Sequence, residues 1–538
     1  MFKRSNILSI VLAFVLILSN TIVFAQESIP EIQPDLMGGN LSVPVRNASS
    51  WALNELVDSD RYGLYNVEDL YTGDLRGLLD DEFKENLLIK FKEKLDSLNL
   101  ETSEKPGFLA EVHNSNTRGD FLRQVYNVLI LYENEENLGK DPIMYLNHIG
   151  IAAGNGKDLF LQRNTSVEEA ILFVKRAVDY IYSENDLDSK GLMWKVENNG
   201  NTVYMLGSIH YGKPDLYPLN NNILQNFSDS DALYVEVDIT NEEELMRIMI
   251  EKFSELEQEF ETSSKFQDGT TLESVIDEDL YSKIKTIMNK HNIPEEDFVS
   301  FNIQGVEQKL NEIIIEKSFE DLSIEDEEAF EQTLEEAMEE LSENEFMKLL
   351  IEGPKLGIDF YFLDKAKTLN KKIGELESIE SQLELIFGGE LFGDLGVDLS
   401  EDEQVQALKE VLENFDSEGN IVELQKNEDE EFSEENFDAE MEEMLKEQEQ
   451  LIEGMFQSIK DGNAEELAKL FLESNGAEIL GGQLIGERDK NMAKVIADLL
   501  QGEEGKTYFV VVGAAHFVVE GTILDNLINM GYKVERVK

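Results

Sequence analysis

The pattern of apolar and polar positions divides the chain into zones of different character. Residues 26–44 are polar and contain three prolines, which is typical of a linker. Residues 45–185 place apolar side chains at helical spacing between short glycine-bearing turns, which predicts an all-helical region. Residues 191–538 begin and end with β-prone runs and carry very acidic helical segments around 241–350 and 395–470. This order predicts an α/β (α+β) C-terminal domain with inserted acidic helices.

The first 25 residues have the features of a secretory signal. Lys3 and Arg4 precede an apolar region at residues 7–18, and residues 23–25 (VFA) resemble a cleavage site for signal removal. The apolar region is shorter than the ~20 residues that a membrane-spanning helix needs. We therefore expect removal of residues 1–25, no remaining transmembrane segment, and a secreted or cell-wall-associated protein. An uncleaved N-terminal anchor is the alternative.

Composition restricts the chemistry that the chain can support. The 112 acidic residues outnumber the 46 basic residues, and the net charge is −66. A surface this acidic repels phosphate backbones, so we expect no nucleic-acid partner. The chain has no cysteine, which excludes disulfides, thiolate nucleophiles and cysteine-type metal sites. Any histidine-based site must use the five histidines of the chain.

A weak internal repeat runs through residues 45–185. Each unit reads as a helix, a turn loop and a second helix opened by a threonine, with TRGD at residues 117–120 in the first unit. In the second unit Thr165 and Glu168 fit a capping box. The arrangement resembles S-layer homology (SLH) modules, which attach proteins to cell-wall polysaccharide. The resemblance implies such a polysaccharide as a partner, and a spacer that keeps the fold without the ligand is the alternative.

Two matching strand ends carry the strongest chemical signal. One β-prone run stops at Gly207 and is followed by His210, and a second stops at Gly513 and is followed by His516. Both therefore read as a strand and then Gly-x-x-His. Glycine allows unusual backbone conformations and a close approach of the backbone to a site. The histidines then fall beyond the carboxyl ends of strands, where open α/β sheets bind ligands.

A carboxylate is the third candidate ligand beside these two histidines. A third strand is expected at residues 232–238, with Tyr234, Glu236 and Asp238 on one face. Glu236 lies in an otherwise apolar run, where an unpaired carboxylate is costly. Two imidazoles and one carboxylate form a workable catalytic metal shell, and such a metal acidifies water and polarises a carbonyl. The alternative is that these are ordinary loop or core residues.

Separated segments of the second half add a family resemblance. The segments are residues 192–196, 204–210, 213–219, 230–238, 357–359, 376–382, 487–492, 513–516 and 531–537. In this order they resemble the TraB/GumN family, relatives of the Tiki metalloproteases, over roughly two-thirds of the chain.

The resemblance implies an α/β fold with two pseudo-repeated halves and a divalent-metal site, with manganese or cobalt by analogy with Tiki proteins. His210, His516 and Glu236 would hold the metal, and Glu236 would also serve as a catalytic base. Arg488 would stabilise developing negative charge. Glu377 corresponds to a further acidic position of the family, in a supporting role, and a carboxylate that only starts a helix is the alternative.

Three functions remain open from the sequence. The first is a metal-dependent peptidase or other hydrolase acting on a peptide or protein, because Tiki relatives cleave peptides near an N-terminus. The second is a non-catalytic wall-associated protein that binds or sequesters pheromone-like peptides. The third is a structural wall protein in which both histidine motifs are only fold elements. Metal-dependent turnover of a peptide would support the first function, and saturable peptide binding without turnover would support the second. Loss of folding in the histidine variants would support the third.

Two further expectations concern surfaces and core. The acidic segments 323–343 and 428–449 keep apolar residues at helical spacing and predict solvated amphipathic helices. A cation-buffering or partner-docking arm is the alternative. Trp51 and Trp194 are expected to anchor the core.

Overall fold

The structure is a computed structural model of the 538-residue chain. It describes residues 43–102, 108–133, 141–155, 157–240, 247–248, 262–266, 268–321, 349, 353–382, 401–422, 434–473, 486–502 and 505–537. The chain divides into two compact units. The first comprises residues 41–242, 348–378 and 448–538, and the second includes residues 243–347 and 379–447. The predicted signal segment, residues 1–25, lies outside the described residues.

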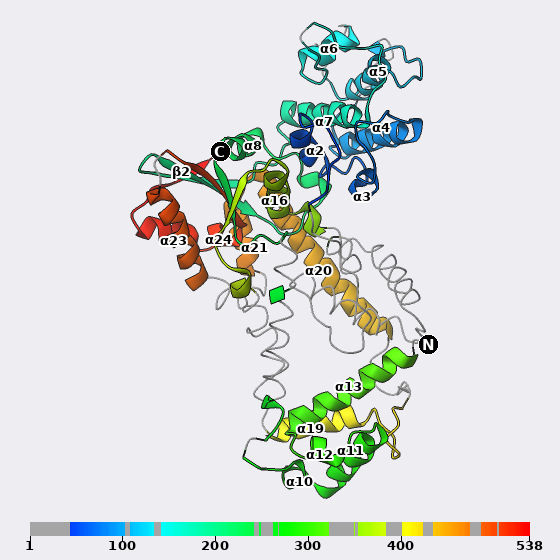
Figure 1. The fold of residues 1–538 in the computed structure, drawn as a ribbon, viewed down its shortest axis with the longest axis vertical. Helices are drawn as coiled ribbons and strands as arrows, with labels where there is room; N and C mark the ends of the chain where they lie inside the picture. Colours follow the sequence, from blue (N-terminus) through cyan, green and yellow to red (C-terminus); the bar gives the residue numbers. More distant parts are fainter. Residues whose placement is uncertain are drawn as a thin grey trace. The chain divides into compact units, whose positions relative to one another are not determined.

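A six-stranded mixed sheet in the order β4-β3-β5-β2-β1-β6 lies within the first unit (Figure 1). The strands are β1 Leu192–Asn198, β2 Asn201–Ser208, β3 Ala232–Val235, β4 Lys372–Glu375, β5 Thr507–Gly513 and β6 Val534–Val537. Strands β4, β3, β5 and β2 run parallel, whereas β1 is antiparallel to both β2 and β6. The four parallel strands therefore end at the same edge of the sheet, and the predicted α/β class is confirmed.

Helices cover this sheet (Figure 1). They are α8 Asn221–Asp229, α16 Ile358–Thr368, α21 Ala464–Glu473, α23 Glu487–Gln501, α24 Ala515–Val518 and α25 Ile523–Asn529, with 3-10 turns η4 Pro214–Leu216 and η5 Gly353–Leu356. Phe509 of β5 packs against Phe227 of α8 at 5.6 Å and Phe362 of α16 at 5.0 Å between ring centroids. Trp194 packs against Phe517 of α24 at 5.2 Å, so Trp194 anchors the core as predicted.

The region that precedes the sheet is helical, as predicted. Its helices are α2 Leu53–Ser59, α3 Val67–Leu70, α4 Asp81–Asp96, α5 Arg118–Leu129, α6 Pro142–His148 and α7 Val167–Glu184. Helices α4, α5 and α7 contact one another in all three pairs. The prediction for Trp51 was wrong, because its side chain lies in the turn before α2 and is 54% exposed. The neighbouring Ala52 and Leu56 are fully buried and fill the core in its place.

The start of α7 differs from the prediction by one residue. Ser166 is the N-cap, and it forms a capping box with Glu169 through backbone-to-side-chain bonds of 3.4 and 3.3 Å. Thr165 was predicted as the cap, with Glu168 as its partner. Its backbone N–H instead donates to the carbonyl of Asn116, so Thr165 belongs to the loop between helices. The Thr165 hydroxyl is buried and has no hydrogen-bond partner among the described residues.

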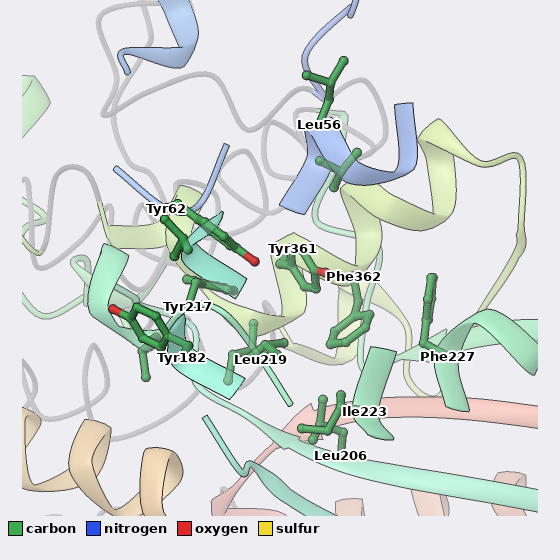
Figure 2. Packing of buried hydrophobic residues seen from close by; sticks show 14 of the residues in the cluster. Leu56, Tyr62, Tyr182, Leu206, Tyr217, Leu219, Ile223, Phe227, Tyr361 and Phe362 are labelled. Carbon is green, nitrogen blue, oxygen red and sulfur yellow. The ribbon is translucent and has the colours of Figure 1, made fainter. Parts of the chain in front are cut away.

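The early helices and the sheet share one hydrophobic core (Figure 2). Tyr62 and Tyr182 come from the helical region, and they lie in the same buried cluster as Tyr217, Tyr361 and Phe362. The rings of Tyr217 and Tyr361 are 5.5 Å apart. Burial of large aromatic side chains on this scale is a main source of folding free energy.

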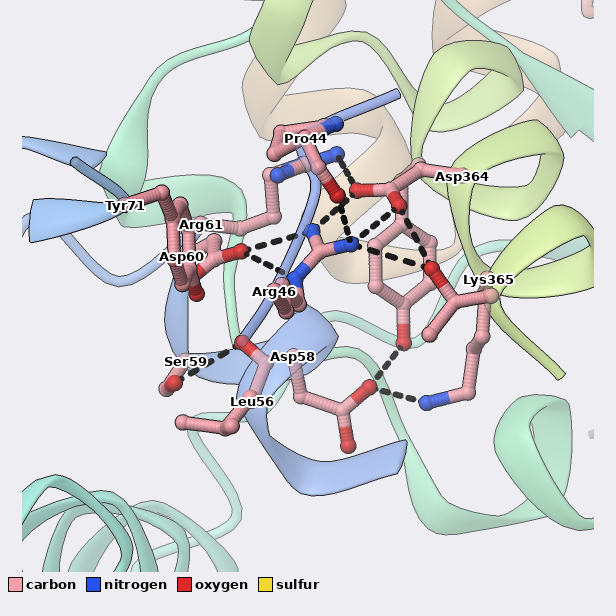
Figure 3. A network of polar contacts seen from close by, with 12 residues as sticks. Pro44, Arg46, Leu56, Asp58, Ser59, Asp60, Arg61, Tyr71, Asp364 and Lys365 are labelled. Atoms are coloured by element: carbon pink, nitrogen blue, oxygen red, sulfur yellow. Dashed lines mark hydrogen bonds and ion pairs between the residues drawn. The ribbon is translucent and has the colours of Figure 1, made fainter. Parts of the chain in front are cut away.

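A buried polar network links the same two parts of the unit (Figure 3). The Arg46 guanidinium donates to Asp60 at 2.7 Å and to Asp364 at 2.6 Å, and Arg61 donates to Asp364 at 2.7 Å. All four side chains are at most 3% exposed. Lys365 pairs with a further buried carboxylate of helix α2. Helix α16 therefore carries buried charges whose partners come from the first residues of the unit.

The second unit is a helical body with a small core of its own. Its helices include α10 Leu272–Val275, α11 Glu278–Lys290, α12 Glu295–Phe298, α13 Ile303–Asp321 and α19 Glu401–Leu412. Leu310 of α13 and Leu408 of α19 are fully buried, and these two helices contact each other. Helix α20, Glu434–Asp461, begins in this unit and ends in the first. Helices thus occur in both intervals where acidic insertions were predicted.

The acidic segment 323–343 lies outside the described residues, and helix α20 includes the larger part of segment 428–449. Among the described residues, none of the helices is both long enough and apolar enough to cross a membrane.

Candidate functional site

The predicted site residues follow four neighbouring strands at one edge of the sheet. His210 comes after β2, Glu236 after β3, Glu377 after β4 and His516 after β5. These are the four parallel strands, so their carboxyl ends bring together residues that are far apart in sequence. In open α/β sheets this edge is the usual place for a ligand.

The alternation pattern predicted that Glu236 lies inside a strand, and this prediction was wrong. Strand β3 ends at Val235, and the carbonyl of Glu236 accepts the backbone N–H of Glu377 at 3.0 Å. The side chain is only 10% exposed. Glu236 is therefore a buried carboxylate at the strand end, and two turns that follow parallel strands hold its backbone in place.

Three of the predicted residues meet in front of Gly513. Its backbone N–H donates to Oε1 of Glu236 at 2.5 Å. A Cβ on Gly513 would lie 3.1 Å from that oxygen, 3.7 Å from Nε2 of His210 and 3.7 Å from Cδ2 of His516. A side chain at position 513 would thus occupy the space that these three groups face. Glycine therefore matters here because it leaves this space open, since Gly513 does not have a positive φ.

Gly207 has a related role one strand away. In the register of β2 and β5, Gly207 is opposite Val512 and Ser208 is opposite Gly513. A Cβ on Gly207 would lie 3.1 Å from the Cβ of Ala514, whose backbone N–H donates to the carbonyl of Ser208 at 2.8 Å. The absence of a side chain at Gly207 lets the turn that carries His516 pack directly on β2.

Each histidine is paired with a carboxylate to which the sequence analysis gave no role. Nδ1 of His210 lies 2.7 Å from Asp359, and Nδ1 of His516 lies 3.1 Å from Asp489. Asp359 is in the first turn of α16 and Asp489 is in the first turn of α23, helices on opposite sides of the sheet (Figure 1). With Nδ1 engaged by a carboxylate, Nε2 is the nitrogen through which each imidazole, when neutral, can coordinate a ligand.

The charges of the site are set by these contacts. Burial raises the pKa of Glu236, but His516, His210, the Gly513 N–H and Arg488 outweigh burial and lower it overall. The carboxylate of Asp359 raises the pKa of His210 to about 9, although desolvation opposes this shift. At neutral pH the edge therefore holds an ionised Glu236 beside a protonated His210.

Arg488 lies between two carboxylates. Its guanidinium donates to Glu377 at 2.6 Å and 3.0 Å, and its Nη2 lies 3.7 Å from Oε2 of Glu236. The side chains of Glu377 and Arg488 are 6% and 15% exposed. Glu377 thus fixes the guanidinium beside Glu236. The structure brings together all five charged or imidazole side chains that the sequence analysis proposed.

The donor set fits a divalent ion in its chemistry. Two imidazole nitrogens and a carboxylate oxygen are ligands that manganese, cobalt and zinc accept. The space that Gly513 leaves is bordered by Oε1 of Glu236 and Nε2 of His210, with the ring of His516 at its side. Across the part of the chain that the structure describes, no group of three or more His, Cys, Asp or Glu side chains is placed so that it could hold a metal ion.

Comparison with known proteins identifies the family. The model of the TraB/PrgY/gumN family matches residues 192–536, which extend from the start of β1 into β6, and the chain belongs to this family. A protein described as a metalloprotease TIKI homolog from Amphimedon queenslandica is 37% identical over 60 residues. The match covers 11% of this chain and 12% of that protein. No solved structure matches the chain.

Proposed function

We propose that the chain is an exported, cell-envelope-associated peptidase or related hydrolase that depends on a divalent metal, manganese or cobalt. The observation that carries the proposal is the convergence of His210, His516 and Glu236 on the space in front of Gly513. The short similarity to a TIKI metalloprotease homolog supports the same chemistry.

The proposed roles follow from position and charge. Nε2 of each histidine and the carboxylate of Glu236 would hold the ion, which would polarise a substrate carbonyl and acidify water. Because its pKa is lowered, Glu236 is ionised at neutral pH and binds a cation or accepts a proton. The Arg488 guanidinium, held by Glu377, lies where it can stabilise negative charge that develops beside Glu236.

The proposal extends to the origin of the two histidine motifs. We regard the domain as two pseudo-repeated halves, each of which contributes a strand followed by Gly-x-x-His. The parallel pairing of β2 with β5 supports this view, because it places equivalent strand ends side by side.

The location at the cell envelope is supported by the sequence pattern. Residues 1–25 resemble a secretory signal, and residues 45–185 resemble SLH modules. Helices α5 and α7, which open at Thr117 and Ser166, would be equivalent helices of two such modules. Cell-wall polysaccharide is the proposed partner. Sedimentation of the chain with purified wall polysaccharide tests this part, and a chain that stays in the supernatant would refute it.

A non-catalytic function has support of its own. The His210 side chain is 59% exposed, and its pKa of about 9 makes it a cation at neutral pH. Without any metal, such an imidazolium can bind a carboxylate of a peptide. This favours, as a second candidate, a wall-associated protein that binds or sequesters peptides.

One experiment separates the two candidates. The full chain, loaded with Mn²⁺ or Co²⁺, is incubated with a peptide library, and both cleavage and binding are measured. The metallopeptidase proposal predicts metal-dependent cleavage that is lost in His210→Ala, His516→Ala and Glu236→Gln. Saturable peptide binding without cleavage in any metal would replace it with the binding function.

A further inference from the structure

The loop that carries His210 is fixed to the segment before helix α16. A Cβ on Gly357 would lie 2.4 Å from the carbonyl oxygen of His210, and a Cβ on Gly212 would lie 1.9 Å from the carbonyl oxygen of Leu356. Such contacts are far closer than real Cβ atoms make, so both glycines are needed for the two backbones to touch. The start of α16 is therefore held directly against the His210 loop.

Because of this backbone contact, Asp359 lies within hydrogen-bond distance of the His210 imidazole. It lies in the first turn of α16, and its Oδ2 is 2.7 Å from Nδ1 of His210. Farther along the same helix, the buried ion pairs of Asp364 and Lys365 fix α16 in position. The carboxylate of Asp359 thus comes from a helix that is held at both its first turn and its middle.

Among the described residues, His210 is the only hydrogen-bond partner of the Asp359 side chain. This side chain is 13% exposed, and its Oδ1 is buried without a hydrogen-bond partner among the described residues. A buried carboxylate with one satisfied oxygen is costly for folding. The hydrogen bond to His210 is therefore the contact that offsets part of this cost.

We propose that Asp359 is a positioning residue for His210. It accepts the Nδ1–H of the imidazole, which holds the ring in the tautomer and orientation that present Nε2 to the space beside Glu236 and Gly513. Histidines that bind metals commonly donate their other ring N–H to a carboxylate in this way. The inference rests on the proposed metal-binding function, and it assigns the residue that prepares one ligand for the ion.

Metal binding is the first test, with Mn²⁺ alone as the probe and the full chain as the protein. Asp359→Ala should weaken Mn²⁺ affinity by about 10- to 100-fold. Asp359→Asn should lose less Mn²⁺ affinity than Asp359→Ala, because its amide oxygen can still accept the Nδ1–H. The matched control is Glu487→Gln, which removes an equal charge from the first turn of α23, where the side chain is 72% exposed, and it should bind as wild type.

The tautomer of His210 is the second test, and it needs no metal. The chain has five histidines, so the imidazole ¹⁵N signals of a histidine-labelled sample can be assigned with single variants. At a pH where the imidazole is neutral, wild type should carry its proton on Nδ1, next to Asp359. Asp359→Ala should shift the proton toward Nε2, whereas Glu487→Gln should not.

The outcomes are distinguishable. If wild type binds Mn²⁺ tightly and Asp359→Ala matches it in affinity and tautomer, the positioning role is wrong and the proposed function stands. If wild type has no tight Mn²⁺ component, the proposed metal-dependent function fails, and the tautomer measurement alone decides whether Asp359 orients His210. If Asp359→Ala does not fold, Asp359→Asn must show a smaller loss in the same direction, and wild-type behaviour of the Asn variant in both tests overturns the proposal.

Discussion

Nε2 of His210 lies 3.7 Å from the point where a Cβ would stand on Gly513. Because Oε1 of Glu236 is only 3.1 Å from the same point, a methyl group there would enter the proposed metal site without straining the backbone. We expect Gly513→Ala to fold and to lose tight Mn²⁺ binding by at least about tenfold, which corresponds to ~1.4 kcal/mol. Titration with Mn²⁺, together with a circular dichroism spectrum, measures both properties.

The control for this variant is Gly73→Ala. A Cβ on Gly73 would meet no atom within 4 Å, and Gly73 does not have a positive φ. This variant should bind and fold as wild type. Equal Mn²⁺ affinity in Gly513→Ala and Gly73→Ala would show that the space in front of Gly513 holds no ion.

Breaking the buried network at helix α16 should destabilise the first unit. Asp364→Ala removes a fully buried carboxylate and leaves Arg46 and Arg61 without their shared partner. Loss of one partner from a buried ion pair typically costs about 3–5 kcal/mol in the free energy of unfolding. Arg76→Ala is the control, because Arg76 and Asp74 form an exposed pair worth about 0–1 kcal/mol. Urea denaturation measures both losses of unfolding free energy. Equally small losses in the two variants would contradict the account.

Lys94 should make stability depend on pH. Its ammonium is buried, donates to the carbonyl of Pro214 at 2.8 Å and faces the rings of Tyr62 and Tyr182. Burial lowers the pKa of Lys94 from 10.5 to about 7. Between these pH values the unfolded chain binds more protons than the folded chain, so the contribution of Lys94 to stability rises with pH, by at most about 1.4 kcal/mol per unit.

The measurement compares wild type with Lys94→Met by denaturation at several pH values from 7 upward. The difference in unfolding free energy should change in favour of wild type as the pH rises, and Lys90→Met, at an exposed position, should show no such trend. Parallel curves for wild type and Lys94→Met would mean that Lys94 keeps an ordinary pKa.

The cap of helix α7 gives a local test. Ser166→Ala removes the capping hydroxyl and should lower the unfolding free energy by about 1 kcal/mol. Thr165→Val removes a buried hydroxyl that has no partner among the described residues, so it should be neutral or slightly stabilising. The opposite order of the two effects in thermal unfolding would favour the cap that the sequence pattern predicted.

The same pair of residues shows what a sequence can and cannot predict. Thr165 with Glu168 and Ser166 with Glu169 both satisfy the spacing of a capping box. The choice depends on the carbonyl of Asn116, which binds the backbone of Thr165 and comes from a distant loop. Local patterns thus predicted the helix, and a long-range contact set its first residue. Trp51 is a similar case, because its exposure depends on what packs over a turn.

The candidate site was predictable where its signal is local. A strand that ends in glycine with a histidine three residues later is visible in the sequence, and strand order brings His210 and His516 to one edge. Asp359 and Asp489 lie in the segments that carry the family resemblance, but their pairing with the histidines was not predicted. An aspartate in the first turn of a helix is common, and its partner histidine is identified only by the fold. The separations are 149 residues for Asp359 and 27 for Asp489.

The most direct test of the account is the affinity of the full chain for Mn²⁺ and Co²⁺, measured beside His210→Ala and His516→Ala. The net charge of −66 will bind cations weakly, so only a tight component near one ion per chain is informative. The account predicts this component in wild type and its loss in both variants while they remain folded. A wild-type chain without the component, or variants that keep it, would contradict the metal site at the sheet edge.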